Sequence, residues 1–139
     1  MHTNIPVIIV DNEHVDRYIA RRHFEQSHDF HVVREFESGD AFIDSFDATT
    51  LQARETASPT LVLMDISMPG KDGFETIRQF AQRAGSDTAS SNVIFVIYTS
   101  SSSIFDREEA ASVSALKGYY EKPLRSDHVS DLLKLCRRH

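Results

Sequence analysis

Residues 61–73 read LVLMDISMPGKDG, an apolar run of strand length followed by an acidic residue and a segment with proline and glycine. The run 61–64 is apolar at every position. A strand with one face in water alternates polar and apolar residues, whereas a strand covered on both faces is apolar throughout. We therefore expect 61–64 to form a buried strand of a parallel sheet, with Asp65 at its carboxyl end.

Four further stretches of strand length lie before and after this run. Residues 7–10 and 93–98 are also continuously apolar, which predicts two more strands inside the sheet. Residues 31–36 contain more polar side chains, as is typical of a strand at a sheet edge. Residues 118–121 predict a short last strand at the opposite edge.

Segments of helical period separate the five strands. Residues 104–116 predict the fourth helix, although their apolar stripe is weak. Ser38 is expected to cap the second helix, and Ser126 or Asp127 the last. The apolar positions that share a face in the other four helices are Val15, Ile19, Ala20 and Phe24; Phe42, Ile43 and Phe46; Phe74, Ile77, Phe80 and Ala81; and Val129, Leu132, Leu133 and Cys136.

This alternation of five strands with five helices predicts an α/β fold, a doubly wound parallel sheet with right-handed crossovers. Residues 1–139 have the length of one domain, so we expect a single domain with no effector domain attached. Two polar stretches, 47–59 and 85–92, are expected to be surface loops.

Composition narrows the class of protein. The chain has a formal net charge of -6, so its average field repels nucleic acid and anionic membranes. Its single cysteine, Cys136, excludes an intrachain disulfide and is expected to pack in the core. We see neither a signal peptide nor an apolar run of the ~18 residues that a membrane span needs. These features favour a cytoplasmic protein that binds neither nucleic acid nor membrane.

Polar residues with a shared chemistry follow four of the predicted strands. Residues 11–13 (Asp-Asn-Glu), Asp65, Thr99 with Ser100, and Lys122 should meet at one edge, because parallel sheets bind ligands at the carboxyl ends of their strands. A carboxylate can attack a phosphoryl group. Oxygen ligands hold a hard divalent cation, and a lysine and a hydroxyl can bind phosphoryl oxygens. The pattern indicates phosphoryl transfer to a carboxylate.

The same segments resemble the receiver domain of two-component response regulators, of the single-domain chemotaxis type. Residues 63–73 resemble its phosphoacceptor loop, with an aspartate, Met-Pro three residues later and then Asp-Gly. Asp11 after the first strand and the Lys122–Pro123 pair resemble the family's acidic pocket and its Lys-Pro motif. The resemblance implies a flavodoxin-like fold with strand order 2-1-3-4-5.

A metal site is the first implication of the resemblance. Asp65 would accept the phosphoryl group and bind Mg²⁺ (or Mn²⁺) together with Asp11, Asn12 and the backbone carbonyl of Ser67. Most members of the family have a second acid where this chain has Asn12. Because an amide oxygen carries no charge, we expect weaker Mg²⁺ binding than in a typical member, unless Glu13 compensates.

The resemblance also implies a switch. Thr99 and Lys122 would bind the phosphoryl oxygens, and Tyr119 would report the state of Thr99 to the outer surface. The family's spacing to the lysine is one residue shorter than from Thr99, so Ser100 is the alternative switch hydroxyl. We prefer Thr99, because it follows the apolar run directly.

Three functions are consistent with these residues. The leading one is a phosphoprotein that receives its phosphoryl group from a histidine kinase or a histidine-phosphotransfer protein. It would signal to a downstream protein through the face made of the fourth helix, last strand and last helix, and would catalyse only its own phosphoryl transfer and dephosphorylation. The second, motivated by Asn12, is an interaction module that takes no phosphate. The third, an enzyme on the same architecture, is disfavoured because Gly70 and Gly73 do not form a glycine-rich phosphate loop.

Overall fold

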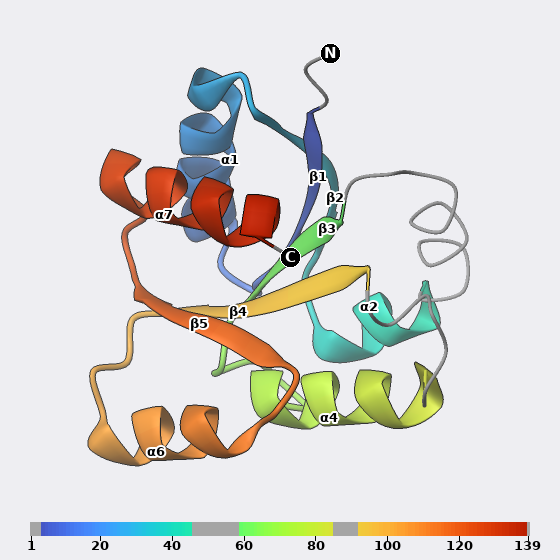
Figure 1. Ribbon diagram of the computed structural model, residues 1–139. Coiled ribbons are helices and arrows are strands. Elements are labelled where there is room, and N and C mark those ends of the chain that lie inside the picture. Colours follow the sequence, from blue (N-terminus) through green and yellow to red (C-terminus); the bar gives the residue numbers. More distant parts are fainter. Residues whose placement is uncertain (1–3, 46–58, 85–91, 139) are drawn as a thin grey trace.

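The computed structural model describes residues 4–45, 59–84 and 92–138. In this part of the chain, strands and helices alternate strictly (Figure 1). The strands are β1 (Ile5–Val10), β2 (Phe30–Phe36), β3 (Thr60–Met64), β4 (Val93–Thr99) and β5 (Leu116–Glu121). The helices are α1 (His14–Ser27), α2 (Gly39–Asp44), α4 (Gly73–Ala84), α6 (Ile104–Ser112) and α7 (Ser126–Arg138).

All five strands are parallel and lie in the order β2-β1-β3-β4-β5, which confirms the predicted fold class and strand order. The more polar β2 and the last strand β5 are the two edges, as their sequences indicated, although β5 begins two residues earlier than the predicted 118–121. None of the helices in the described part combines the length and the apolar character that crossing a bilayer requires.

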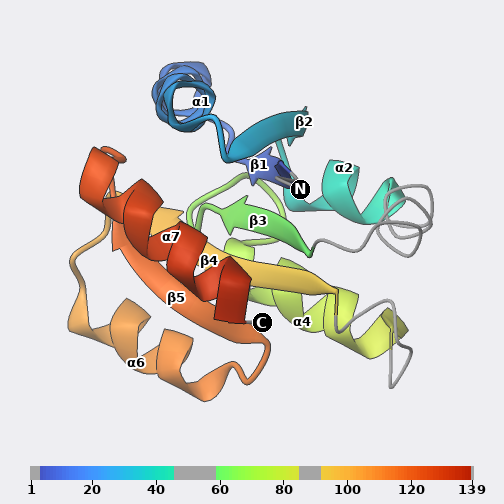
Figure 2. The same ribbon diagram turned by 45° about the horizontal axis from the view of Figure 1, so that its top comes forward.

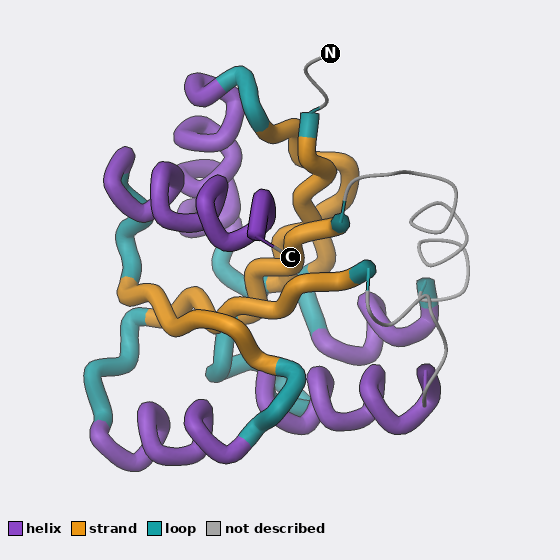
Figure 3. The backbone as a smooth tube through the Cα atoms, viewed as in Figure 1, coloured by secondary structure: helices purple, strands orange, loops and turns teal. Residues whose placement is uncertain are grey.

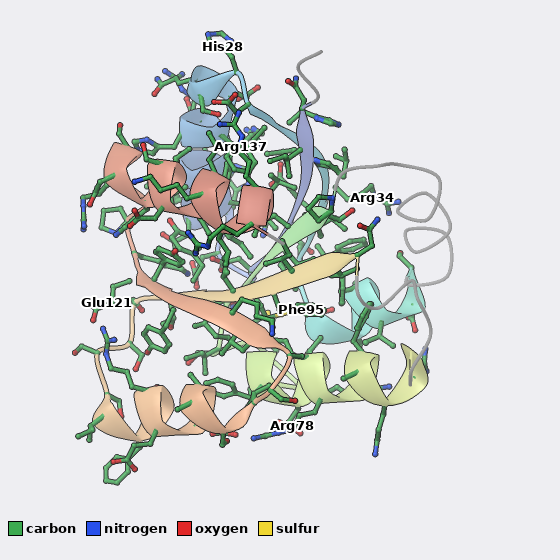
Figure 4. The ribbon with its side chains drawn as sticks, viewed as in Figure 1. His28, Arg34, Arg78, Phe95, Glu121 and Arg137 are labelled. Carbon is green, nitrogen blue, oxygen red and sulfur yellow. The ribbon has the colours of Figure 1, made fainter. Side chains whose placement is uncertain are left out.

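Helices cover both faces of the sheet, with α1 and α7 on one face and α2, α4 and α6 on the other (Figure 2). Successive side chains of a strand point to opposite faces. In β1, Val7 and Ile9 pack in the layer of α1 and α7, whereas Ile8 and Val10 pack in the other layer. Phe95 of β4, which Figure 4 labels, belongs to the second layer. Its ring meets that of Phe80 edge to face. Burial on both faces explains the continuous apolar runs.

The predicted inner face of α1 was partly wrong. Ala20 and Phe24 are fully buried, but Val15 is 64 % exposed. Arg17 takes the inward position one turn before Ala20, and its Nη1 donates to the carbonyl oxygen of Asp11 at 2.6 Å. Its Nε donates to Glu35 at 3.3 Å, so the buried charge has partners. A pattern of apolar residues alone does not reveal a charged residue that is satisfied inside.

The fourth helix is shorter than predicted. It ends at Ser112, and Val113 has extended backbone angles and a buried side chain. Leu116, expected at the helix end, instead begins β5 opposite Phe95. Leu116 is partly buried and packs against the core on this face of the sheet, and the weak helical stripe of the segment does not oppose its place in the strand.

Figure 3 shows the helices and strands along the backbone, and the ends and inner faces of the helices agree only partly with the sequence predictions. Ser38 caps α2 as predicted, accepting from the backbone N–H of Ala41 at 3.1 Å. The predicted cap of α7 was wrong, because Ser126 and Asp127 already lie in its first turn. Ala81 is exposed on α4, contrary to expectation. Phe46 and most of the loops expected at 47–59 and 85–92 lie outside the described residues.

Candidate functional site

The sheet register brings Asp11 and Asp65 together. Val10 and Met64 are partners across β1 and β3, so the next residue of each strand reaches the same point of the edge. The backbone N–H of Asp65 donates to the carbonyl oxygen of Val10 at 2.9 Å, which extends this pairing into the site. Asp11 is 0 % exposed and Asp65 5 % exposed. Two carboxylates are therefore buried side by side, as the strand ends predicted.

Lys122 meets both of them from the end of β5. It follows Glu121, which Figure 4 labels at the carboxyl end of that strand. The ammonium nitrogen Nζ lies 2.6 Å from Oδ2 of Asp11 and 3.5 Å from Oδ2 of Asp65. The lysine side chain is only 7 % exposed. Because burial removes the screening by water, each of these contacts is stronger than a surface ion pair.

The pKa of the Asp65 carboxyl group lies above that of an ordinary aspartate. Burial and the charge of Asp11 raise its pKa to about 6, while Lys122 and the backbone N–H of Ile66 oppose the rise. That N–H donates to Oδ1 of Asp65 at 2.9 Å. Asp65 is thus ionised at neutral pH, but its negative charge is less favourable than on a surface aspartate. A buried carboxylate with a raised pKa is typical of functional sites.

The pKa of Lys122 is also raised. Burial lowers it, but the contacts with Asp11 and Asp16 and the charge of Asp65 more than offset this effect, so the net pKa lies above its usual value. The ammonium therefore stays protonated across the physiological range. Lys122 acts here as a permanent cation among carboxylates.

Glycine brings helix α4 against Asp65. A Cβ at Gly73 would lie 2.1 Å from the carbonyl oxygen of Asp65, so only glycine fits there. Asp72 accepts from the backbone N–H of Glu75 (2.8 Å), and Glu75 accepts from that of Asp72 (3.2 Å), which makes a capping box. The Asp72–Gly73 pair is therefore explained by how α4 starts. Ser67, between Asp65 and this cap, is exposed.

Thr99 and Ser100 differ in burial. Thr99 ends β4 and is 2 % exposed, whereas Ser100 is exposed. The Thr99 hydroxyl oxygen accepts from the backbone N–H of Ser101 at 3.2 Å, and its carbonyl oxygen accepts from Lys122 N–H at 2.8 Å. This placement favours Thr99 as the hydroxyl that belongs to the site.

Tyr119 is tied to the loop that follows Thr99. Its hydroxyl donates to the carbonyl oxygen of Ser101 at 3.0 Å, and the guanidinium of Arg107 lies 4.6 Å from its ring centroid. Ser101 therefore contacts Thr99 through its N–H and Tyr119 through its carbonyl.

Sequence reasoning missed two residues that contact Lys122. Asp16, in the first turn of α1, accepts from Nζ at 2.8 Å. The ring centroid of Tyr98 lies 5.4 Å from Nζ, and its buried hydroxyl accepts from the backbone N–H of Leu124 at 3.0 Å. An acid in a first helical turn reads as a partner of the helix dipole, and a tyrosine inside an apolar strand as core. Neither pattern signals a lysine that lies far along the chain.

The residues present fit a hard divalent cation. Oδ2 of Asp11 is fully buried, and no hydrogen-bond donor in the described part of the chain satisfies it with good geometry, although Lys122 lies 2.6 Å away. No group of three or more His, Cys, Asp or Glu side chains is arranged for a metal among the described residues. Two carboxylates, the amide of Asn12 and the Ser67 carbonyl are nevertheless oxygen donors, the set that Mg²⁺ prefers.

A doubly wound parallel sheet with two acids, a hydroxyl and a lysine at its carboxyl edge defines a class of signalling domain, the phosphoacceptor domains of two-component systems. The chain belongs to the response regulator receiver domain family, whose model matches residues 7–134. Receiver domains are signalling phosphoacceptors that generally bind Mg²⁺ at the phosphorylation site, and they are generally not classical enzymes.

Two curated relatives are similar in sequence. The positive alginate biosynthesis regulatory protein of Pseudomonas aeruginosa is 32 % identical over 132 residues, covering 95 % of this chain and 47 % of the relative. The uncharacterized transcriptional regulatory protein YhcZ of Bacillus subtilis is 35 % identical over 77 residues, covering 55 % of this chain and 32 % of the relative. The chain thus spans less than half the length of either relative.

A solved structure is similar throughout. The two-component response regulator from Cytophaga hutchinsonii superposes with a TM-score of 0.83 at 22 % identity and covers 99 % of this chain and 100 % of that one. At this identity the likeness supports the fold alone.

Proposed function

We propose that this chain accepts a phosphoryl group on Asp65 from a histidine kinase or a histidine-phosphotransfer protein, with Mg²⁺ bound beside it. The observation that carries the proposal is the buried carboxylate of Asp65, with the Asp11 carboxylate beside it and the Lys122 ammonium 3.5 Å away. Burying two acids and a lysine together costs free energy, because the charges lose their hydration, so such a cluster favours a functional site over ordinary core packing.

In the proposed reaction, a carboxylate oxygen of Asp65 attacks the phosphorus of a phosphohistidine. The new O–P bond forms as the P–N bond breaks, and its electron pair goes to the imidazole nitrogen, which takes up a proton. The Lys122 ammonium forms an ion pair with one phosphoryl oxygen, and the Thr99 hydroxyl donates a hydrogen bond to another. The bound Mg²⁺ would neutralise charge on the phosphoryl oxygens.

The cation would be held by oxygens from two strand ends. Asp11 and Asp65 supply the charged ligands, and Asn12 and the Ser67 carbonyl the neutral ones. Asn12 is partly buried beside Asp11 in the chain. With one charged ligand fewer than in a typical member, we expect the weaker metal binding that the sequence indicated.

The output of the proposed switch is a changed protein-binding surface around α6, β5 and α7. A cavity of about 220 Å³ lies between α6 and β5, lined by Arg107 and Tyr119 among others. When the Thr99 hydroxyl rotates to donate to a phosphoryl group, it loses its hydrogen bond with the backbone N–H of Ser101. The hydrogen bond from the Tyr119 hydroxyl to the carbonyl oxygen of Ser101 then changes as well. The ring, which lines this cavity, can then change its position, and this reshapes the surface as a shift between two populations.

Asn12 favours one second function, an interaction module that takes no phosphate. Its surface would then be fixed in the conformation described here. Two further statements stay predictions from the sequence: that the chain acts without an effector domain, and that it is located in the cytoplasm.

Incubation with acetyl phosphate and Mg²⁺, followed by mass spectrometry of the intact chain, tests the proposal. We expect the wild-type chain to gain one phosphoryl group, and the gain to disappear with EDTA or in Asp65→Asn. Asp131→Asn makes the same chemical change on the exposed face of α7 and should label as the wild type does. Labelling of Asp65→Asn would place the acceptor elsewhere. No mass gain, and no spectral response to beryllofluoride at millimolar Mg²⁺, would favour the interaction module.

A further inference from the structure

Lys122 contacts a third carboxylate that the reaction itself does not use. Its Nζ lies 2.8 Å from Oδ2 of Asp16, nearly as close as to Asp11 and closer than to Asp65. The Asp16 side chain is 30 % exposed, whereas that of Lys122 is 7 % exposed. Asp16 therefore holds the ammonium from the solvent side, and Asp11 holds it from inside the site.

The two inner carboxylates are also the groups that a cation would occupy. A divalent ion bound to Asp11 and Asp65 would repel an ammonium that stays on the same oxygens. Lys122 then needs another partner, because a buried ammonium without one is costly. Asp16 is such a partner, already in contact and outside the pair of metal-binding carboxylates.

Charge counting points the same way. Asp11, Asp16 and Asp65 surround one ammonium, which leaves two negative charges in the cluster. That excess equals the charge of a divalent cation.

We propose that Asp16 is a positioning residue for Lys122, which gives the ammonium a place outside the metal-binding oxygens and so allows a divalent cation to bind at Asp11 and Asp65. The inference deepens the proposed function and rests on it. It predicts that Asp16 supports metal binding through Lys122, and not as a ligand or as a general negative charge.

The test is the affinity for Mg²⁺ alone, measured by calorimetry or by amide NMR shifts without any phosphodonor. Asp16→Asn should weaken Mg²⁺ binding about fivefold, a size typical of coupled charged neighbours. Asp16→Glu keeps the charge and should restore most of the affinity. Glu25→Gln removes the same charge from an exposed position on α1 and should change the affinity by less than about twofold.

The same substitution in a Lys122→Met background separates the mechanisms. If Asp16 acts through Lys122, Asp16→Asn should then change Mg²⁺ affinity by less than about twofold. An equal loss in both backgrounds, or no loss in the wild-type background, would overturn the inference. A wild-type chain that labels with acetyl phosphate while Asp16→Asn binds Mg²⁺ normally would refute the role of Asp16 alone. A wild-type chain that neither binds Mg²⁺ nor labels would refute the proposed function, and this role with it.

Discussion

The ammonium of Lys122 lies 2.6 Å from Asp11 but 3.5 Å from Asp65, so in this state the lysine neutralises the neighbour of the proposed phosphoacceptor more than the phosphoacceptor itself. The lysine and a metal ion would therefore share Asp11. Phosphorylation of Asp65 requires that the positive charges be redistributed, with the metal on the carboxylates and the ammonium on the phosphoryl group.

Asn12→Asp should tighten Mg²⁺ binding about tenfold, because it adds a charged oxygen ligand beside Asp11. Calorimetric titration with Mg²⁺ measures the change. Gln26→Glu adds the same charge at an exposed position of α1 and serves as the control. An unchanged or weaker affinity in Asn12→Asp would show that position 12 lies outside the coordination shell.

Lys122→Met should destabilise the metal-free fold by about 3 kcal/mol, because it leaves buried carboxylates without their cation. Urea unfolding in EDTA measures the loss. Adding Mg²⁺ should restore much of the stability, since the ion replaces the missing positive charge. If Mg²⁺ stabilised the variant no more than it stabilises the wild type, lysine and metal would not be exchanging at the same carboxylates.

Asp65→Asn should stabilise the metal-free fold at pH 7 by about 1–3 kcal/mol. The folded chain raises the pKa of Asp65 to about 6, so it binds this proton more tightly than the unfolded chain does. Ionisation of Asp65 therefore costs stability as the pH rises through about 6. The gain from Asp65→Asn should shrink below that pH and vanish near pH 4, in unfolding curves measured in EDTA. A gain independent of pH would contradict the origin in charge.

Phosphorylation by acetyl phosphate should slow on acidification, with a midpoint below the value of about 6 that holds for the metal-free site, because only the ionised Asp65 carboxylate attacks. Initial rates at saturating Mg²⁺, followed by mass spectrometry, give the profile. Metal binding favours the ionised carboxylate and should move the midpoint below that of the metal-free site. A rate that rises on acidification would exclude Asp65 as the nucleophile.

Thr99→Ala should weaken beryllofluoride binding about tenfold, whereas Ser100→Ala should leave it unchanged. Removing one hydrogen bond to a charged group has this size. Of these two residues, Thr99 is buried at the end of its strand, whereas Ser100 is exposed. Amide NMR titration with beryllofluoride and Mg²⁺ distinguishes the two variants, and the reverse result would assign the switch to Ser100.

The order and type of the elements could be predicted from local pattern, and so could the acids and the lysine at the strand ends. A strand buried on both faces must be apolar throughout, so a few consecutive apolar residues are enough to predict the strands at 61–64 and 93–98. The parallel arrangement then sends their carboxyl ends to one edge. Asp11, Asp65 and Lys122 meet there as expected.

Features that depend on contacts between distant segments were missed. The sequence does not indicate that Arg17 turns inward and Val15 outward, because the carbonyl of Asp11 and the carboxylate of Glu35 that receive the guanidinium come from outside the helix. Leu116 joins a strand because the neighbouring β4 offers it a partner in Phe95.

The amino-acid sequence by itself determined the fold class, the strand order through its family resemblance, and the identity of the acidic and basic groups at the sheet edge. Only the tertiary structure decided how these charges are distributed, with Lys122 on Asp11 and Asp16 and a raised pKa at Asp65. The physical reason is that apolar periodicity is local, whereas the energy of a buried charge depends on every neighbour that the fold brings within a few ångströms.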